Sequence, residues 1–266
     1  MGRDGGGSIA RGMVDHMNAP LHDNVRTLVL TGASRGIGHA TVKKFSASGW
    51  RIITISRQPF SALCPWPSGG ENHVQLDLAD PLELGRGIEA IRQRLAGGRL
   101  DALVNNAAVS PKGKNGTRLG AIDTPFDLWR QVFNVNFFAP VALARGLIEE
   151  LSAAHGAVVN VTSIAGSRVH PFAGSAYATS KAALAALTRE MAHDFGPLGI
   201  RVNAIAPGEI NTSILSPGTE KIVENQIPMR RLGTPDEVAD VIHFLCEKGA
   251  SYVSGAEIQI NGGQHV

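Results

Sequence analysis

Short apolar runs alternate with longer segments of helical periodicity from Val25 to the end of the chain. The apolar runs are rich in leucine and β-branched residues and are nearly continuous, which is typical of parallel strands covered on both faces. The pattern predicts strands at Arg26–Leu30, Arg51–Ser56, His73–Leu76, Ala102–Asn105, Ala157–Val161, Arg201–Ile205 and Glu257–Ile260. It predicts helices at Gly36–Ser48, Pro81–Leu95, Phe126–Ser152, Ser175–Phe195 and Pro235–Leu245. Because strands and helices alternate, we expect an α/β fold with βαβ units and one parallel sheet.

Two of the predicted helix starts carry capping residues. In each, a side-chain oxygen that can cap the helix is followed by proline at the first helical position and glutamate at the third: Asp80-Pro81-Leu82-Glu83 and Thr234-Pro235-Asp236-Glu237. The stretch after Ser56 differs, since it holds three prolines and a Gly-Gly pair. A regular crossover helix is therefore not expected there.

Two predicted helices, Phe126–Ser152 and Ser175–Phe195, are apolar on more than one side. A helix of this kind must bury a second face, either under the sheet or against another subunit. We therefore expect a homo-oligomer, a dimer or a tetramer, formed through these helices.

Composition excludes several classes of protein. The net charge is +2, and the basic residues are spread along the chain. This gives no reason to expect nucleic acid or a membrane surface as a partner. No apolar run approaches the roughly 18–20 residues of a membrane span. The two cysteines, Cys64 and Cys246, stand far apart without histidines at ligand spacing. We therefore expect no disulfide framework, no metal site and a cytoplasmic location.

The N-terminal 24 residues contain glycines and charges but no apolar segment of a secretory signal. We expect residues 1–24 to form a mobile tail and residues 25–266 to form one domain, because no linker or repeat divides them.

A glycine-rich turn follows the first predicted strand and leads into a helix. Its sequence is Thr31-Gly32-Ala33-Ser34-Arg35-Gly36-Ile37-Gly38. Glycines in such a turn let the backbone approach a phosphate, and the helix N-terminus offers free N–H groups and a positive dipole. The spacing is G-x-x-x-G-x-G rather than G-x-G-x-x-G, and glycines can also merely shape a tight turn. The order strand, turn, helix favours a dinucleotide site.

The end of the second predicted strand indicates which dinucleotide is preferred. A carboxylate at this position would hold the free ribose 2′-hydroxyl of NAD(H), but the strand ends in Ile55-Ser56-Arg57. Arg57, together with Arg35 of the glycine-rich turn, has a guanidinium geometry that suits a 2′-phosphate. The alternative is that both arginines are merely solvated. We expect NADP(H) in preference to NAD(H).

Tyr177 and Lys181 stand four residues apart in a predicted helix and therefore share one face. An ammonium near a phenol favours its ionised form, so we expect the pKa of Tyr177 to fall below its ordinary value of about 10. The phenol would then serve as a proton donor near neutral pH. The same spacing also occurs on ordinary helices, as an apolar stem beside a solvated charge.

Taken together, these motifs resemble the short-chain dehydrogenase/reductase family, in its ordinary single-domain subfamily, from about Val25 to Gly263. Besides the glycine-rich turn and the Tyr177-x-x-x-Lys181 pair, the similar segments are Asp77-Leu78, Asn105-Asn106-Ala107-Ala108, Asn136, Ser163, Pro207-Gly208-Glu209-Ile210-Asn211-Thr212, Ser254-Gly255 and Asn261-Gly262-Gly263. The resemblance implies a Rossmann-like, doubly wound parallel sheet. It also implies an NAD(P)-dependent oxidoreductase that transfers a hydride between the nicotinamide and a carbonyl or alcohol.

The resemblance implies four catalytic residues. Tyr177 would pass its proton to the carbonyl oxygen, and Lys181 would tune the tyrosine and bind the nicotinamide ribose. Ser163 would hold the substrate oxygen, with the adjacent Thr162 as the weaker candidate for this role. Asn136 would position a water that links Lys181 to solvent.

Cofactor contacts follow from the same resemblance. Asp77 would bind the adenine amine and Asn105 the adenosine ribose, whereas Ile210 and Thr212 would hold the carboxamide. The full set expected to bind the cofactor is Gly32, Ser34, Arg35, Gly36, Ile37, Gly38, Arg57, Asp77, Leu78, Asn105, Ala107, Tyr177, Lys181, Pro207, Gly208, Ile210 and Thr212.

Three segments are expected to wall the substrate pocket: Val109–Asp123, Ser167–Ser175 and Glu209–Gln226. The last would be a mobile lid. The first carries Lys112, Lys114 and Arg118, which would suit an anionic substrate, although such a charge run is more often a solvated loop.

Two other functions stay open. A 3-oxoacyl-thioester reductase acting on acyl-carrier-protein substrates shares these motifs. A nucleotide-sensing protein without catalytic activity would also keep the fold, but the intact set of Asn136, Ser163, Tyr177 and Lys181 argues against it.

Overall fold

The structure is a computed structural model that describes residues 25–60, 69–212 and 218–266. The predicted N-terminal tail, residues 1–24, lies outside the described residues. Seven parallel strands form one sheet in the order β3-β2-β1-β4-β5-β6-β7. The strands are β1 (Thr27–Thr31), β2 (Arg51–Ser56), β3 (His73–Gln75), β4 (Ala102–Asn105), β5 (Ala157–Val161), β6 (Arg201–Pro207) and β7 (Glu257–Ile260). The predicted doubly wound α/β fold is confirmed.

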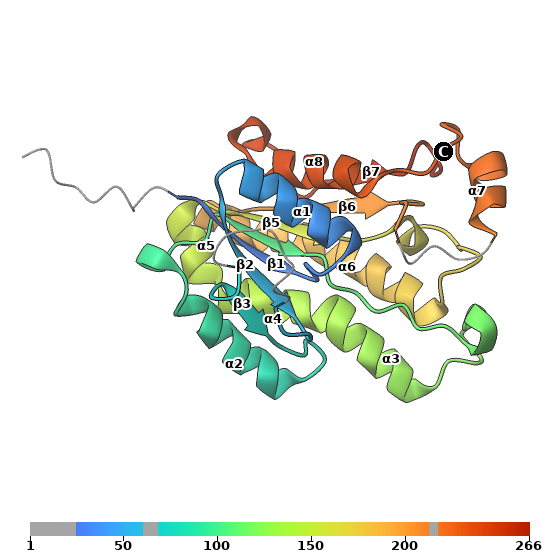
Figure 1. Ribbon diagram of the computed structural model, residues 1–266, viewed down its shortest axis with the longest axis horizontal. Coiled ribbons are helices and arrows are strands. Elements are labelled where there is room, and N and C mark those ends of the chain that lie inside the picture. The colour runs from blue at the N-terminus through green and yellow to red at the C-terminus, as the bar shows by residue number, and fades with distance from the viewer. Residues whose placement is uncertain (1–24, 61–68, 213–217) are drawn as a thin grey trace, which may run out of the picture.

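Helices cover both faces of this sheet (Figure 1). On one face α1 (Gly36–Ala47) packs against α8 (Pro235–Cys246). On the other face lie α2 (Pro81–Arg92), α3 (Phe126–Phe133), α4 (Ala139–Gly146), α5 (Ile148–Ala154) and α6 (Ser175–Phe195). A further helix, α7 (Thr219–Gln226), follows β6, and short 3₁₀ turns lie at Ala96–Gly98, Lys114–Gly116, Ile164–Gly166, Gly196–Leu198 and Lys248–Ala250. Within the described residues, no helix combines the length and the apolar character needed to cross a bilayer.

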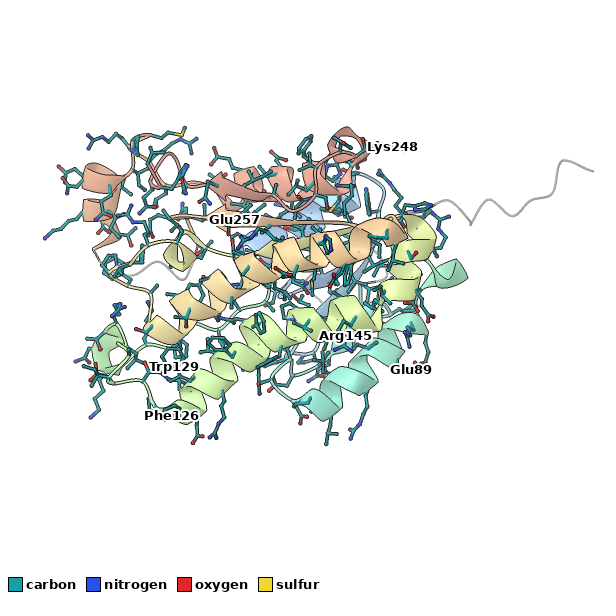
Figure 2. All side chains as sticks on the ribbon, turned by 180° about the vertical axis from the view of Figure 1, so that it is seen from behind. Glu89, Phe126, Trp129, Arg145, Lys248 and Glu257 are labelled. Carbon is teal, nitrogen blue, oxygen red and sulfur yellow. The ribbon has the colours of Figure 1, made fainter. Side chains whose placement is uncertain are left out.

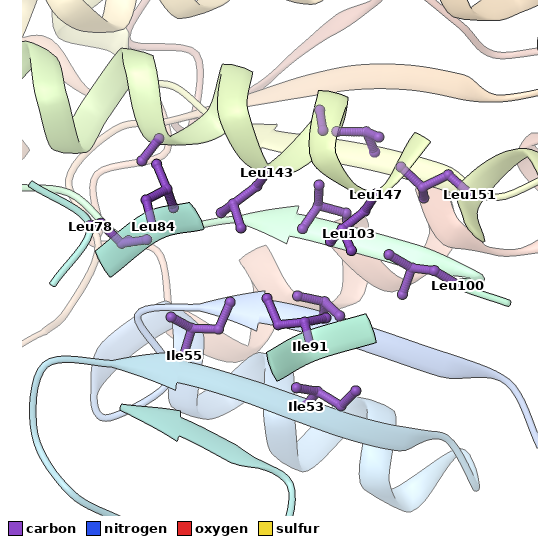
Figure 3. Packing of buried hydrophobic residues seen from close by; sticks show 14 of the residues in the cluster. Ile53, Ile55, Leu78, Leu84, Ile91, Leu100, Leu103, Leu143, Leu147 and Leu151 are labelled. Atoms are coloured by element: carbon purple, nitrogen blue, oxygen red, sulfur yellow. The ribbon is translucent and has the colours of Figure 1, made fainter. Parts of the chain in front are cut away.

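The core is split into two layers by the alternation of side chains along the strands. In β1, Leu28 and Leu30 face α1 and α8, whereas Val29 faces α2 and α4. Figure 3 shows the second layer, in which Ile53 and Leu103 of the sheet lie beside apolar side chains of the covering helices, among them Ile91 and Leu147. Burying one such aliphatic side chain contributes roughly 1.5–3 kcal/mol, so both layers stabilise the sheet that carries the site.

The predicted helix Phe126–Ser152 is not continuous. After α3 the chain forms one π-helical turn, Asn134–Phe138, and a second break at Leu147 separates α4 from α5. Pro140 explains the first break, because it has no N–H to donate to the carbonyl of Asn136, so the regular i→i−4 bond is missing at this point.

Several helix ends differ from the prediction, whereas the capping residues act as expected. Asp80 accepts hydrogen bonds from the N–H groups of Leu82 and Glu83, and Thr234 forms a reciprocal capping box with Glu237. The α2 helix ends at Arg92, three residues early. Residues 57–60 and 69–72 contain no helix, as predicted, and residues 61–68 of this connection lie outside the described residues.

Candidate active site

A cleft of about 570 Å³ opens at the carboxyl ends of the central strands. This is where doubly wound sheets bind ligands, next to the point at which the winding reverses between β1 and β4. The sequence-predicted residues that line it are Gly32, Ser34, Arg35, Gly36, Ile37, Arg57, Asp77, Leu78, Ala107, Ser163, Tyr177, Lys181, Pro207, Gly208, Ile210 and Thr212. The structure therefore gathers in one cavity residues from most of the length of the chain.

The glycine-rich turn leaves no room for a side chain at Gly32 or Gly38. Gly32 has φ +72°, and a Cβ atom there would lie 2.8 Å from the Cα atom of Ala107. A Cβ atom on Gly38 would lie 2.0 Å from the carbonyl oxygen of Gly32. Asn106 braces the turn, since its Nδ2 donates to the carbonyls of Thr31 and Gly32 at 3.1 and 2.9 Å. The backbone at the N-terminus of α1 is thus held open for a phosphate, which fits a dinucleotide cofactor.

Two residues expected at the cofactor lie behind the wall of the cleft. Gly38 packs under the turn. Asn105 is only 3% exposed, and its Nδ2 donates at 2.8 Å to Asn160 Oδ1, its register partner on β5. Asn160 in turn donates to Thr188 Oγ1 of α6 at 3.0 Å. The structure therefore directs the Asn105 side chain into the sheet–helix layer and not to a ribose.

Ser163 and Tyr177 bring two hydroxyl groups together in the cleft. Ser163 lies two residues after the end of β5, and its side chain is hydrogen-bonded to that of Tyr177. The neighbouring Thr162 is committed elsewhere, since its hydroxyl lies 2.7 Å from the carbonyl oxygen of Ile205 and 2.6 Å from Glu257 Oε1. Of the two candidates, only Ser163 presents its hydroxyl to Tyr177.

The expectation that the pKa of Tyr177 falls below its ordinary value is wrong. Burial raises the pKa of Tyr177, the hydrogen bond with Ser163 partly opposes this shift, and the charge of Glu209 adds to it. Burial also lowers the pKa of Lys181 to about 7. The Lys181 Nζ lies 5.8 Å from the centre of the Tyr177 ring and donates to the carbonyl of Val161 at 2.6 Å. The two side chains lie on one helix face, as predicted. For both groups, however, the loss of hydration on burial has a larger effect on the pKa than the neighbouring side chain.

Asn136 is fully buried in the π turn and does not line the cleft. Its Oδ1 accepts from the N–H of Val109 at 2.9 Å, and its Nδ2 donates to the carbonyl of Val109 at 3.0 Å. A third bond, also 3.0 Å, joins Nδ2 to Ser180 Oγ on α6. Asn136 thus ties the loop after β4 to the helix that carries Tyr177 and Lys181.

At the substrate end of the cleft lie three titratable side chains: Lys112, His170 and Glu209. Lys114 is exposed outside the lining, and Arg118 Nε donates to the carbonyl of Ala173 at 2.9 Å. Only one member of the predicted basic run therefore reaches the cavity. His170 and Glu209 were not singled out from the sequence, because nothing in their spacing shows that two loops 39 residues apart meet.

Comparisons with known proteins agree with this geometry. A family model described as enoyl-(acyl carrier protein) reductase matches residues 32–265. Protein FixR of Bradyrhizobium diazoefficiens is 61% identical over 256 residues, which are 96% of this chain and 92% of that protein. A 3-oxoacyl-[acyl-carrier-protein] reductase, FabG of Thermotoga maritima, is 34% identical and covers 90% of this chain and 97% of its own length.

A solved structure is similar to this chain in both sequence and fold. It is an oxidoreductase of the short chain dehydrogenase/reductase family from Brucella ovis, in complex with a partially ordered NAD. It is 62% identical, with a TM-score of 0.78 over 89% of this chain and 100% of that chain.

Proposed function

Because the chain belongs to the short-chain dehydrogenase/reductase family, we propose that it is an NADP(H)-dependent oxidoreductase that interconverts a carbonyl and an alcohol, with Tyr177 as the general acid and base. One observation carries the proposal. The Ser163–Tyr177 hydroxyl pair and the buried Lys181 lie in the same cleft as the open glycine-rich turn.

Each residue has a role that its surroundings support. The nicotinamide, when bound, supplies or accepts the hydride. Tyr177 holds a proton at its hydroxyl next to Ser163, so the two groups can share one substrate oxygen. Lys181 is 1% exposed and has a pKa of about 7, so it carries a substantial fraction of positive charge at neutral pH. That charge favours the tyrosinate formed when the proton leaves. Asn136 is a positioning residue.

The decisive variant is Tyr177→Phe, with Tyr252→Phe as the matched control. Tyr252 is the other tyrosine of the chain and is fully exposed outside the cleft. A screen of carbonyl compounds that follows oxidation of NADPH and NADH should find substrates for the wild-type protein. Tyr177→Phe should keep cofactor binding and lose at least about 100-fold in kcat, and Tyr252→Phe should match wild type. Near-wild-type turnover by Tyr177→Phe would remove this residue from the reaction.

The preference for NADP(H) rests on two arginines. Arg35 and Arg57 line the cleft, and neither has an ion-pair partner within the described part of the chain. No carboxylate stands among the lining residues at the end of β2. The Brucella ovis relative was solved with NAD, so the preference needs a direct test. Arg57→Ala should weaken NADPH binding by about 10-fold and NADH binding little. Equal affinities for both cofactors in both proteins would contradict the preference.

A second candidate is reduction of 3-oxoacyl thioesters. The similarity to the Thermotoga maritima protein favours it. Acetoacetyl thioesters in the same screen distinguish this candidate from a reductase of free carbonyl compounds. A thioester reductase should prefer them to every free ketone of similar size.

We also propose a homo-oligomer. Phe126 of α3 is 82% exposed and Phe138 of the π turn is 54% exposed. Figure 2 shows Phe126 and Trp129 on α3, which runs beside α6. An exposed aromatic surface along α3 and the π turn that follows it fits a subunit interface. Light scattering on wild type and Phe138→Ser should show a smaller species for the variant.

A further inference from the structure

The substrate end of the cleft is built from one titratable side chain on each of the three predicted walls. Lys112 comes from the loop after β4, His170 from the loop before α6 and Glu209 from the segment after β6. The His170 and Glu209 side chains are only 9% and 11% exposed, although both line the cavity. A buried carboxylate is costly unless it is paired, so its position at a cavity wall calls for an explanation.

The hydrogen bonds assign the tautomer of His170. Phe172 N–H donates to His170 Nδ1 at 3.3 Å, so this nitrogen is the acceptor of a neutral imidazole. The proton then resides on His170 Nε2, which lies 2.5 Å from Glu209 Oε1 and donates to it. Glu209 is therefore a carboxylate oriented by His170. Its other oxygen, Oε2, accepts no hydrogen bond from the residues that the structure describes.

Lys112 supplies the complementary charge. Its ammonium donates to the carbonyl of Phe172, and burial lowers its pKa while Glu209 raises it. No carboxylate lies within ion-pair distance of Lys112 among the described residues. The ammonium has three donors, of which one is used, and the carboxylate offers an acceptor. With neutral His170, the three side chains carry no net charge.

This balance decides among three classes of substrate. An anionic substrate would gain from Lys112 but would be repelled by Glu209. An aliphatic ketone would leave the remaining donors of Lys112 and the Oε2 of Glu209 without partners, which costs free energy in a buried site. A neutral substrate with hydroxyl groups can donate to Glu209 and accept from Lys112. Lys112 and Glu209 line the same cavity as Tyr177, and the charge of Glu209 also acts on Tyr177.

We propose that Lys112 and Glu209, the latter positioned by His170, select a neutral hydroxylated carbonyl compound, such as a small ketose. This inference rests on the proposed function, since it names the substrate class of the same site.

The test compares two compounds with one carbon skeleton: erythrulose, which is 1,3,4-trihydroxybutan-2-one, and butan-2-one. Full-length wild-type protein should reduce erythrulose with a kcat/KM at least about 100-fold higher, because a site built to bond hydroxyl groups rejects an analogue without them. Binding is measured separately by calorimetry, using Tyr177→Phe loaded with oxidised cofactor. Erythrulose should bind this complex at least about 10-fold more tightly than butan-2-one.

Two variants with matched controls locate the preference. Glu209→Gln and Lys112→Met should each lower kcat/KM for erythrulose at least about 10-fold, mainly through KM, and change it for butan-2-one by less than about 3-fold. Lys112→Arg should restore most of the loss. The controls are Lys114→Met and Glu220→Gln, which change exposed residues outside the cavity and should match wild type.

The outcomes separate the two proposals. Equal kcat/KM for both compounds would overturn the inference and leave the oxidoreductase assignment intact. If the variants lower kcat/KM equally for both compounds, the three residues only hold the loops together, and this result also overturns the inference. If neither compound is reduced, the calorimetry decides: equal or absent binding of erythrulose contradicts the inference. The proposed function fails only if no carbonyl compound in the wider screen is reduced.

Discussion

The two ends of the cleft are built differently. At the nucleotide end, the backbone of the glycine-rich turn forms the surface, and neighbouring atoms leave no space for a Cβ on Gly32 or Gly38. At the substrate end, the surface consists of side chains from three loops, among them Lys112, His170 and Glu209. The first end is defined by which side chains are absent, and the second by which are present.

This difference explains what each end can specify. A backbone cradle at a helix N-terminus recognises a phosphate, which many ligands share. A buried carboxylate beside an ammonium recognises a particular arrangement of hydrogen-bond donors and acceptors, which few ligands share. Substitutions at the nucleotide end should therefore affect every substrate alike, whereas substitutions at the substrate end should discriminate among substrates.

The largest effect is expected for Gly38→Ala. The new Cβ would lie 2.0 Å from the carbonyl oxygen of Gly32, a backbone atom that cannot move without opening the turn. We expect a loss of more than about 3 kcal/mol in the free energy of unfolding. Cofactor binding should be lost for NADPH and NADH alike. Urea unfolding and cofactor fluorescence measure the two effects, and a variant that binds cofactor normally would show that the turn is not the cradle.

Lys181→Met tests the burial of charge between the two ends. The pKa of Lys181 falls from 10.5 to about 7 on folding, so the unfolded chain binds more protons between these values. Wild-type stability therefore drops as pH falls through this window, and methionine has no charge to bury. Without added cofactor, the free energy of unfolding of the variant minus that of wild type should be about 3 kcal/mol larger at pH ~6 than at pH ~9.5. A difference that does not change with pH would mean that the ammonium is hydrated in the folded protein.

Asn136→Ala tests the connection between the loop after β4 and α6. The substitution leaves the N–H and C=O of Val109 without their partner. We expect a loss of about 2 kcal/mol in the free energy of unfolding. Because Val109 leads to Lys112, KM for the substrate should rise more than the Kd for the cofactor. Equal weakening of cofactor and substrate would place Asn136 at the nucleotide end instead.

The smallest effect is expected for Gly85→Ala, a glycine outside the cleft. Gly85 lies within α2, and a Cβ there would meet no atom within 4 Å. The substitution should raise the free energy of unfolding by about 0.5–1 kcal/mol, because alanine loses less backbone entropy in a helix. Cofactor and substrate binding should not change. A lower free energy of unfolding for this variant would show that replacing a glycine destabilises this protein even where a Cβ atom contacts no other atom.

The difference between a surface made by one local turn and a surface made by distant loops also explains which parts of the fold and the site could be predicted from the sequence. Strands β2, β4 and β5 were predicted to the residue, because continuous apolar runs bounded by polar or glycine residues leave little choice of ends. The glycine-rich turn was predictable because only glycine satisfies its geometry. The π turn was not, because the effect of Pro140 depends on how the following turn repacks. The His170–Glu209 pair and the inward direction of Asn105 depend on tertiary contacts between distant segments, which no local pattern encodes.

The central claim is direct transfer of a hydride to a carbonyl at the Tyr177 site. Reduction of a carbonyl substrate with a reduced nicotinamide cofactor that carries deuterium at both C4 positions tests it, with mass spectrometry of the alcohol product. The account predicts one deuterium on the former carbonyl carbon for wild type, with the product formed at least about 100-fold more slowly by Tyr177→Phe. Product that forms without the label, or labelled product formed equally fast by Tyr177→Phe, would contradict it.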